Sequence, residues 1–365
     1  MGKDFSGIKT QKFGIEVECT GLTRAEAAEA IAAVFATEPR HFGGAYDKYG
    51  AWDSKGRLWT IVSDSSIECT YRDGEPADSF FAVELVSPIL EYEDIPLLQD
   101  VVRAIRKHGG ICNESTGIHI HIDFEPYDAQ KLRNLVNIFA SKSDMLYKAL
   151  QVEEWRENEY CKKLEERFIR ELNRRKPKDM ETVKRLWYGD NYDHSSHYDS
   201  SRYCVLNIHS VFQNNNFEVR AFNSSLHAGV IRAYISLVLA ISNQALTQKS
   251  ANPKVMTSDN PRYTFRTWLI RMGLNGDEFK NCRTHLLKHL EGNIAWRHPE
   301  DAIAQRERLK QKRLAEKERR VSPVSNEREI FGKVPIDTNK AAVSDCESDL
   351  DEVSEAEESI AVMTM

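Results

Sequence analysis

Four short segments of this chain alternate apolar side chains with charged or metal-binding ones, and this alternation narrows the folds that the sequence can adopt. The segments are residues 13–18, 83–88, 117–123 and 217–222. Successive side chains of a β-strand point to opposite faces of the sheet, so the apolar side chains can enter a core while the polar ones project from the other face. The pattern predicts four strands, each with one buried face and one polar face.

The polar face of the first segment carries Glu16 and Glu18. Two carboxylates on one strand face lie roughly 6.5–7 Å apart by strand rise. Such an arrangement is unfavourable unless water or a cation lies between them. The same alternation places His119, His121 and Asp123 on one face of the third segment and Glu218 beside Arg220 in the fourth. The pattern favours a bound metal ion.

Composition limits the class of protein. The chain has 365 residues, 41% of them hydrophobic, which is sufficient for a globular core. It has no continuous run of about 18 apolar residues, and its first six residues lack the apolar region of a signal peptide. We therefore expect a cytoplasmic protein that does not contact a membrane. The seven cysteines are scattered and include no C-x-x-C pair, so we expect reduced thiols rather than a zinc or redox centre.

Charge is distributed unevenly along the chain. The formal net charge is −6, but residues 341–365 hold eight acidic side chains and no Lys or Arg, so the rest of the chain carries +2. A nearly neutral body gives no general argument for nucleic-acid binding. The tail, residues 299–365, combines a basic, charged helix over 302–320 with the acidic segment, and we expect it to be disordered or marginally helical. It could recruit a partner protein, although a solubilising role is the simpler interpretation.

Helix and strand signals organise residues 1–298, which we expect to form one catalytic domain. Thr23 and Glu26 form a capping-box signature that opens a helix, and residues 53–56 form a turn that leads into a strand over 58–62. The sequence also predicts helices over 96–107, 132–150, 230–245, 263–272 and 277–290, and a β-hairpin of 201–211 and 216–222 that turns at 213–216. Hairpins and helices without regular βαβ units predict an antiparallel-rich α+β fold.

An insert, residues 153–200, interrupts this domain. Its first part is charged and helical, and its second part is rich in aromatic residues and histidine around His194 and His197. An insert of this length either covers a functional site or forms a solvated excursion at the surface. The sequence leaves both interpretations open.

If the four patterned strands are neighbours in one curved sheet, a single face carries an unusual set of side chains. The set is Glu16, Glu18, Glu84, His119, His121, Glu218 and Arg220. Carboxylates with imidazole and without thiolate suit Mg²⁺ or Mn²⁺, because hard cations favour oxygen ligands. Arg220 could clamp a phosphate or a developing oxyanion in planar geometry. Together these groups indicate phosphoryl transfer from a nucleotide.

Each part of the pattern also has a simpler explanation. Glu-x-Glu in a strand is most often the solvated face of an antiparallel sheet, and two imidazoles on one strand face occur on surfaces as well as in metal sites. Glu218 with Arg220 could be a surface ion pair. For His194, His197 and His209 a structural role is favoured over metal binding. The functional interpretation depends on the conjunction of the segments.

Six motifs, in this order along the chain, resemble those of the amidoligase family of carboxylate–amine ligases. They are Phe-Gly-Ile-Glu-Val-Glu from residue 13, Asp-Ser-Ser-Ile from 64, Val-Glu-Leu-Val-Ser-Pro from 83, Gly-Ile-His-Ile-His-Ile-Asp from 117, Arg-Tyr-Cys-Val-Leu-Asn from 202 and Phe-Glu-Val-Arg-Ala-Phe-Asn from 217. The resemblance spans about residues 11–295. It implies a glutamine synthetase-like fold, in which a curved, largely antiparallel sheet forms a metal-lined active-site face and helices back the sheet. It also implies an ATP-dependent ligase, similar to glutamate–cysteine ligases, with two or more Mg²⁺ or Mn²⁺ ions.

The resemblance further implies roles for individual residues. Glu16, His119 and Glu218 would hold a metal ion on the γ-phosphate side, while Glu18, Glu84 and, as a further candidate, Asp64 would hold another near the substrate. His121, Arg202 and Arg220 would contact ATP, Asn207 and Ser87 would contact substrate, and Arg220, Glu16 and Glu218 would be catalytic. Asp64 lies 20 residues before Glu84. The corresponding acids of glutamate–cysteine ligases are much closer, which leaves direct ligation by Asp64 open.

The implied reaction converts a carboxylate into an acyl phosphate at the expense of ATP, and an amine then displaces the phosphate. The substrates would be small-molecule or peptide carboxylates and amines, and the motifs do not distinguish among them. Because water would destroy the intermediate, the insert would be the natural cover of the site. Two alternatives stay open: a metal-dependent phosphotransferase or phosphohydrolase on the same fold, and an inactive binding or scaffold protein.

Overall fold

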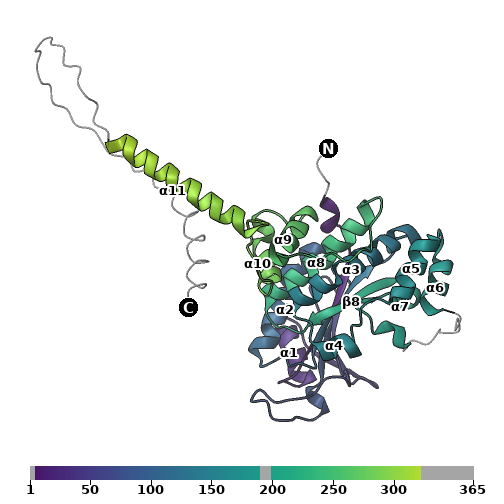
Figure 1. Cartoon of the computed structure of the whole chain (residues 1–365). Helices are drawn as coiled ribbons and strands as arrows, with labels where there is room; N and C mark the ends of the chain where they lie inside the picture. Colours follow the sequence, from purple (N-terminus) through teal and green to yellow (C-terminus); the bar gives the residue numbers. More distant parts are fainter. Residues whose placement is uncertain (1–4, 190–198, 322–365) are drawn as a thin grey trace, which may run out of the picture. The chain divides into compact units, whose positions relative to one another are not determined.

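One antiparallel sheet organises the computed structural model, which describes residues 5–189 and 199–321 (Figure 1). In this part of the chain the sheet has eight strands in the order β2-β3-β4-β5-β1-β6-β8-β7. The strands are β1 Phe13–Cys19, β2 Arg40–Gly43, β3 Lys48–Trp52, β4 Leu58–Val62, β5 Val83–Val86, β6 Gly117–Asp123, β7 Leu206–Asn207 and β8 Asn216–Asn223. Every neighbouring pair is antiparallel, so the predicted α+β class is confirmed.

The four patterned segments form adjacent strands, β5, β1, β6 and β8, at the centre of the sheet. The register pairs Glu18 with Glu84, Glu16 with His119, and His121 with Glu218. Residues directly opposite each other in an antiparallel pair place their side chains on the same face. The predicted polar face is therefore confirmed, and it is continuous across the four strands.

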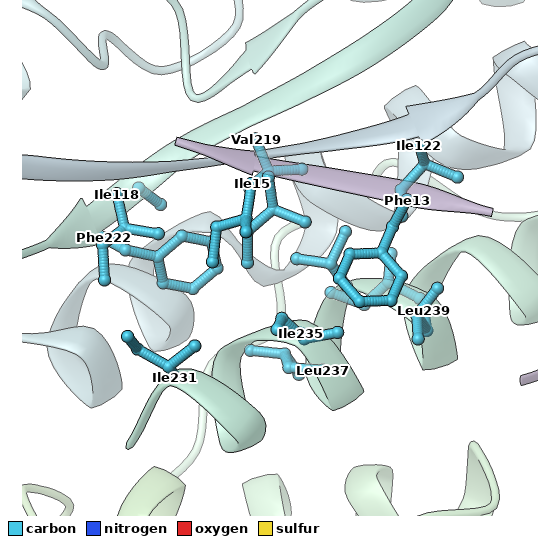
Figure 2. Packing of buried hydrophobic residues seen from close by; sticks show 14 of the residues in the cluster. Phe13, Ile15, Ile118, Ile122, Val219, Phe222, Ile231, Ile235, Leu237 and Leu239 are labelled. Carbon is cyan, nitrogen blue, oxygen red and sulfur yellow. The ribbon is translucent and has the colours of Figure 1, made fainter. Parts of the chain in front are cut away.

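A layer of helices covers the apolar face. The principal helices are α1 Arg24–Phe35, α2 Ile95–Lys107, α3 Ala129–Leu150, α8 Ala228–Thr247, α9 Pro261–Arg271 and α10 Lys280–Leu287. Helix α1 packs against β3 and β4, α8 against β6, and α3 against β8, while α8 also contacts α2, α3 and α10. Figure 2 shows Phe13, Ile15 and Ile122 facing Ile235 and Leu239 of α8. Full burial of each such side chain contributes about 1.5–3 kcal/mol to folding.

Helix α8 is long and apolar enough to cross a membrane by length and composition alone. However, 67% of its most apolar window is buried inside the fold, against the sheet and the neighbouring helices. Its apolar side chains therefore serve as the centre of the core.

Local sequence signals set the ends of several helices. The predicted capping box is present, since the Thr23 hydroxyl accepts a hydrogen bond from the Glu26 backbone N–H and the Glu26 carboxylate accepts one from that of Thr23. The helix predicted from residue 277 begins later as α10, because Asp277–Phe279 forms a 3₁₀ turn. Other 3₁₀ turns cover Ser6–Ile8, Ser79–Phe81, Tyr92–Asp94 and Ser200–Arg202.

A β-bulge interrupts the pairing of β6 with β8. Ile120 pairs with Val219, but Ile118 pairs with Phe222, so β8 holds one extra residue between these positions. Strict alternation would place Phe222 on the polar face with Arg220. The bulge returns Phe222 to the core, where its ring stacks on Tyr234 of α8 with centroids 4.4 Å apart. Alternation along the strand does not indicate this bulge.

The predicted β-hairpin of 201–211 and 216–222 is confirmed only in part. Leu206–Asn207 pairs antiparallel with β8, but the strand is short, and helix α7, His209–Asn214, takes the place of the predicted turn. Asn215 ends this helix in a left-handed conformation, with φ of 53°. Asparagine tolerates that conformation, so the asparagine-rich stretch terminates a helix instead of forming a two-strand turn.

The insert is packed against the domain in its first part. It forms α4 Glu154–Glu159, α5 Glu166–Arg175 and α6 Met180–Tyr188, and α5 contacts both α3 and α6. Phe168, Leu172 and Val183 are buried in the core. A solvated excursion therefore does not describe this part. His194 and His197 lie outside the described residues.

The chain consists of two compact units, residues 1–306 and 307–365. The helix predicted over 302–320 is present within α11, Pro299–Val321. Three of its apolar side chains, Ile303, Leu309 and Leu314, are about half exposed, so residues 300–317 of α11, whose side chains are described, form no buried apolar face. The acidic segment 341–365 lies outside the described residues.

The turn between β3 and β4 is organised by a buried carboxylate. The Asp53 side chain accepts hydrogen bonds from the backbone N–H groups of Lys55 and Arg57, the Arg57 guanidinium and the Trp59 indole. These bonds offset the desolvation of the acid and hold its pKa below its usual range. The turn thereby fixes β4, which leads directly to Asp64.

We expect Asp53→Ala to lower the free energy of unfolding by about 2–4 kcal/mol, because it leaves the buried Trp59 indole and two backbone N–H groups without an acceptor and removes one of the two carboxylates that pair with Arg57. Urea unfolding measures the change. Ser54→Ala, at the exposed neighbouring position, is the control and should stay within about 0.5 kcal/mol of wild type. Equal stabilities of the two variants would contradict this account of the turn.

Candidate active site

A cleft of about 660 Å³ opens on the polar face of the sheet. Its walls include five of the predicted metal-binding residues, Glu16, Glu18, Asp64, Glu84 and His119, together with Arg156, Arg202 and Arg220. A larger cavity of about 1220 Å³ lies among α3, α8 and α9. None of the metal-binding clusters found in the described residues lies there, so the smaller cleft is the candidate active site.

Three clusters of side chains on this face are compact enough to hold a metal ion. They are Glu16 with Glu84 and His119, Glu16 with His121 and Glu218, and Glu18 with Asp64 and Glu84. Within each cluster the potential ligand atoms lie within 4.8 Å of one another. Glu16 and Glu84 each belong to two clusters, so the sites are contiguous.

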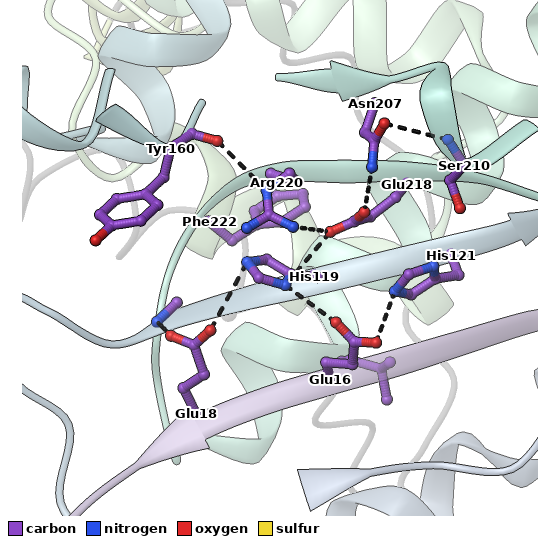
Figure 3. Close-up of polar contacts among 12 residues, drawn as sticks. Glu16, Glu18, His119, His121, Tyr160, Asn207, Ser210, Glu218, Arg220 and Phe222 are labelled. Atoms are coloured by element: carbon purple, nitrogen blue, oxygen red, sulfur yellow. Dashed lines mark hydrogen bonds and ion pairs between the residues drawn. The ribbon is translucent and has the colours of Figure 1, made fainter. Parts of the chain in front are cut away.

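Glu16 lies between two imidazoles (Figure 3). Its Oε2 is 3.1 Å from Nδ1 of His119, and its Oε1 is 3.2 Å from Nε2 of His121. Burial alone would raise the pKa of Glu16, but the charge of His121 and the hydrogen bonds from both rings hold it well below its usual range. Glu16 is therefore an ionised carboxylate at the centre of the face.

Glu218 is buried and held from two sides. Its Oε1 contacts the Arg220 guanidinium and lies 3.4 Å from Nδ1 of His119, and its Oε2 accepts a 2.6 Å hydrogen bond from the Asn207 amide. Burial opposes ionisation, but Arg220, His119 and His121 together lower the pKa of Glu218 to about 2. The predicted set Glu16, His119 and Glu218 is thus in mutual contact through His119.

The second acidic cluster has the opposite electrostatic character. Burial raises the pKa of Glu18, although its Oε2 accepts a 2.6 Å hydrogen bond from the Gly117 backbone N–H. The pKa of Glu84 lies well above its usual range, because burial and then Glu16 and Glu18 oppose its ionisation. A cation placed between Glu18 and Glu84 would relieve this opposition to their ionisation.

Asp64 joins this cluster in spite of its distance from Glu84 along the sequence. Strand β4 pairs with β5 so that Val62 lies opposite Glu84, and Asp64 follows two residues later. The intervening residues form a loop outside the sheet. The 20-residue separation is therefore compatible with a shared site, which supports Asp64 as a ligand candidate.

Arg220 is 5% exposed, so a surface ion pair with Glu218 does not describe it. Its Nε donates to the Tyr160 carbonyl at 3.3 Å, and its guanidinium lies 5.8 Å from the centre of the Tyr203 ring. Arg202 also lines the cleft and lies 5.7 Å from the same ring. Both arginines are positioned to contact an anionic ligand.

The two predicted substrate contacts lie outside the cleft wall. Asn207 is buried. Its side-chain amide donates a hydrogen bond to the Glu218 carboxylate, and its side-chain oxygen accepts one from the backbone N–H of Ser210. The Ser87 hydroxyl accepts a hydrogen bond from the Ile15 backbone N–H and donates one to the Pro88 carbonyl. In this arrangement Asn207 orients Glu218, a candidate metal ligand, and Ser87 binds the backbone of β1. His209 has the structural role that we favoured, buried against Tyr188.

The sequence suggested the insert as a cover of the site but did not identify which of its residues reach the cleft. Arg156 of α4 and Tyr160, immediately after α4, line the cleft, as do Tyr46, Ser115 and Tyr203. Only Tyr203 lies within one of the motifs. The contact that reveals Arg156 is with Gly117, where an added Cβ would lie 2.4 Å from its Nη2.

In the absence of metal, raising the pH from 6.5 to 9 should lower the free energy of unfolding, by on the order of 2 kcal/mol. The charges of Glu16 and Glu218 raise the pKa of His121 from 6.5 to about 9, against the effect of burial. In the folded state His121 keeps its proton up to about pH 9, whereas in the unfolded state it loses the proton near pH 6.5. The stabilisation by protonated His121 is therefore fully present below pH 6.5 and is lost as the pH rises through 9. The raised pKa of Glu84 acts in the same direction. Urea unfolding in EDTA measures the slope.

His121→Gln is the matched variant and should reduce this slope. Added MgCl₂ should stabilise wild type more at pH 9 than at pH 6.5, because metal ions compete with protons for the same ligand atoms. Identical pH slopes for wild type and the variant would contradict the assignment of His121.

A comparison with known protein families covers the part of the chain that holds the site. A family model described as "Putative amidoligase enzyme" matches residues 9–242, which include all strands of the described sheet and all three metal-binding clusters. No curated protein matches the chain. The match covers more than half of the 365 residues, so the resemblance seen in the motifs is confirmed. The chain belongs to the amidoligase family, whose members are ligase-type enzymes.

Proposed function

We propose that this protein is an ATP-dependent carboxylate–amine ligase with a glutamine synthetase-like fold, and that it acts through an acyl phosphate on an amino acid or peptide. The observation that carries the proposal is the juxtaposition of three contiguous metal-binding clusters with a buried arginine on one sheet face. Phosphoryl transfer needs this combination of cations and positioned charge.

The donor set fits hard divalent cations. Each cluster contains at least two carboxylates and at most one imidazole, and none contains a thiolate. The raised pKa of Glu84 also indicates that these acids are packed more closely than anions tolerate on their own. Mg²⁺ or Mn²⁺ held there would neutralise charge on phosphoryl oxygens during transfer.

The nucleotide is assigned to the Glu16 and Glu218 side of the face. His121 and Arg220 supply cationic hydrogen-bond donors there, and Arg202 lines the adjoining wall. Arg220 is already oriented by Glu218 and the Tyr160 carbonyl, so little reorganisation is needed when negative charge develops on the transferred group. The acid is assigned to the Glu18, Asp64 and Glu84 side.

The proposed reaction has two steps. A carboxylate oxygen of the acid attacks the γ-phosphorus, the bond to the β-phosphate oxygen breaks, and ADP leaves. The amine nitrogen then attacks the acyl carbon, the carbon–oxygen bond to phosphate breaks, and the amine loses a proton. Arg156 and Tyr160 form part of the cleft wall, so the insert helps to exclude water from the intermediate.

The decisive experiment is an ADP-release screen with MgATP and pooled amino acids and peptides, with hydroxylamine as a surrogate amine. Mass spectrometry should detect a hydroxamate, which is lighter by one water than the acid and hydroxylamine combined. ADP release that requires both an acid and an amine selects the ligase. Phosphate release without ATP selects a phosphohydrolase, and transfer to the acid or another acceptor without amide formation selects a phosphotransferase.

Glu16→Gln and Glu218→Gln should each reduce amine-dependent ADP release by roughly 10²-fold or more, because each removes a charge from the phosphoryl-transfer face. Glu29→Gln, at an exposed position of α1, is the control and should retain wild-type activity. Circular dichroism and thermal unfolding establish that the variants are folded. Near-normal activity of the folded Glu16→Gln variant would contradict the assignment of Glu16 to the phosphoryl-transfer site.

Glu16 and Glu18 should have separable functions although they lie on the same strand. Glu16→Gln should weaken Mg²⁺-dependent binding of a non-hydrolysable ATP analogue roughly tenfold or more, whereas Glu18→Gln should change it much less. Glu18→Gln should instead raise the KM for the acid. Isothermal titration calorimetry and steady-state kinetics measure the two effects, and equal losses of nucleotide affinity in both variants would contradict this division.

A further inference from the structure

Arg156 is a buried cation in the cleft wall for which the described residues supply no ion-pair partner. It is 3% exposed, and no carboxylate in the described part of the chain lies within 4.0 Å of its guanidinium. Its Nε is buried without a hydrogen-bond acceptor, and its Nη2 makes a single long contact, 3.5 Å from the Phe222 carbonyl oxygen. The guanidinium therefore has unused donors at the edge of the cleft.

The fold holds Arg156 in this position from several sides. Helix α4 supplies the residue, and the neighbouring Trp155 ring lies 5.9 Å from the guanidinium carbon. On the opposite side, Gly117 leaves the space that the guanidinium occupies, since an added Cβ would lie 2.4 Å from Nη2. The Phe222 carbonyl belongs to the bulged part of β8. These contacts fix the position of the Arg156 side chain in the cleft wall.

Other buried arginines of the domain show how unusual this environment is. Arg24 is 4% exposed and pairs with Asp47, and Arg220 is 5% exposed and pairs with Glu218. An unpaired guanidinium in a comparable environment costs several kcal/mol. A ligand that supplies a negative charge would recover that energy, so the cleft is suited to an anionic group at Arg156.

The position of Arg156 distinguishes the acid from the nucleotide. Arg156 lies against Gly117, whose backbone N–H donates to Glu18 at 2.6 Å, next to Asp64 and Glu84, whereas His121 lies against Glu16 and Arg220 against Glu218. The phosphate side therefore already has its cations. A guanidinium offers parallel donors that match a carboxylate, and Ser115 lines the same wall.

We propose that Arg156 binds a second carboxylate of the acid substrate, one that does not react, so that the enzyme selects acids with two carboxylates. This inference rests on the proposed function, because it takes the Glu18 side of the cleft as the acid site. A phosphate of the nucleotide is the other source of negative charge, and the experiment separates the two.

The test measures ligand-induced shifts in thermal unfolding of the full-length protein with Mg²⁺ and a non-hydrolysable ATP analogue. The probes are acids paired with analogues that lack one carboxylate: succinate with propionate, glutarate with butyrate, and glutamate with 2-aminobutyrate. At least one dicarboxylate should bind wild type tenfold or more tightly than its partner, and Arg156→Gln should abolish this preference. Affinity for the ATP analogue should stay within about twofold.

Arg156→Lys provides a second variant in case Arg156→Gln fails to fold. It keeps the charge but loses the planar pair of donors, so it should reduce the preference for the dicarboxylate about tenfold. Arg57→Lys is the control, because Arg57 pairs with Asp53 and Asp94 and does not line the cleft. It should leave the preference unchanged.

Three outcomes would overturn the inference. The wild-type protein could bind every dicarboxylate no more tightly than its paired analogue, or both Arg156 variants could keep the wild-type preference. The third outcome is that the Arg156 variants lose affinity only for the ATP analogue. The last would identify Arg156 as a phosphate contact. Failure of the proposed function has a different signature, in which the dicarboxylate preference depends on Arg156 but no acid supports amine-dependent ADP release.

Discussion

The arrangement of this protein depends on the mutual repulsion of carboxylates collected on one buried sheet face. Glu16 and Glu218 remain ionised because His119, His121 and Arg220 surround them. The acids on the other side lack comparable cations, so burial and neighbouring acids raise the pKa of Glu84. The face is thus electrically divided: His121 and Arg220 pair with Glu16 and Glu218, whereas Arg156, on the Glu18 side, pairs with no carboxylate of the described residues. That division gives a physical basis for separate nucleotide and acid sites.

The geometry of the face comes from strand pairing, with two local departures. Alternation places Glu218 and Arg220 on the polar face, and the bulge in β8 returns Phe222 to the core two residues later. The insert then brings Arg156 over the strand ends, beside Gly117. Bulges and inserted segments tolerate chemistry-bearing residues because they lie outside the regular ladder of hydrogen bonds. The core beneath, formed by the apolar faces of β1, β6 and α8, stays regular.

Much of this was predictable because period-two alternation is a local property. The polar side of each segment could be assigned without knowledge of the fold, and Glu16, His119 and Glu218 were expected on one face if the strands were neighbours. Helices with a capping box or apolar periodicity were also recognised from the sequence. The antiparallel partner of β8 was predicted, but the connection between the two strands was not, since an asparagine-rich stretch suits a turn and a helix end equally well. The prediction that Asn207 contacts substrate stays a prediction, and its amide donates a hydrogen bond to Glu218. The sequence did not indicate this partner of the side chain.

Alternation along each strand is enough to establish which side chains leave on the polar side, and the motifs are enough to identify the family. Which of those side chains meet depends on the assembled fold. Strand order made β4 and β5 neighbours and brought Asp64 to Glu84 across a long loop. Packing of the insert placed Arg156 in the cleft wall. Alternation follows from the geometry of one chain segment, whereas ligand clusters and unpaired buried charges depend on contacts between distant segments, whose stability is shared across the whole core.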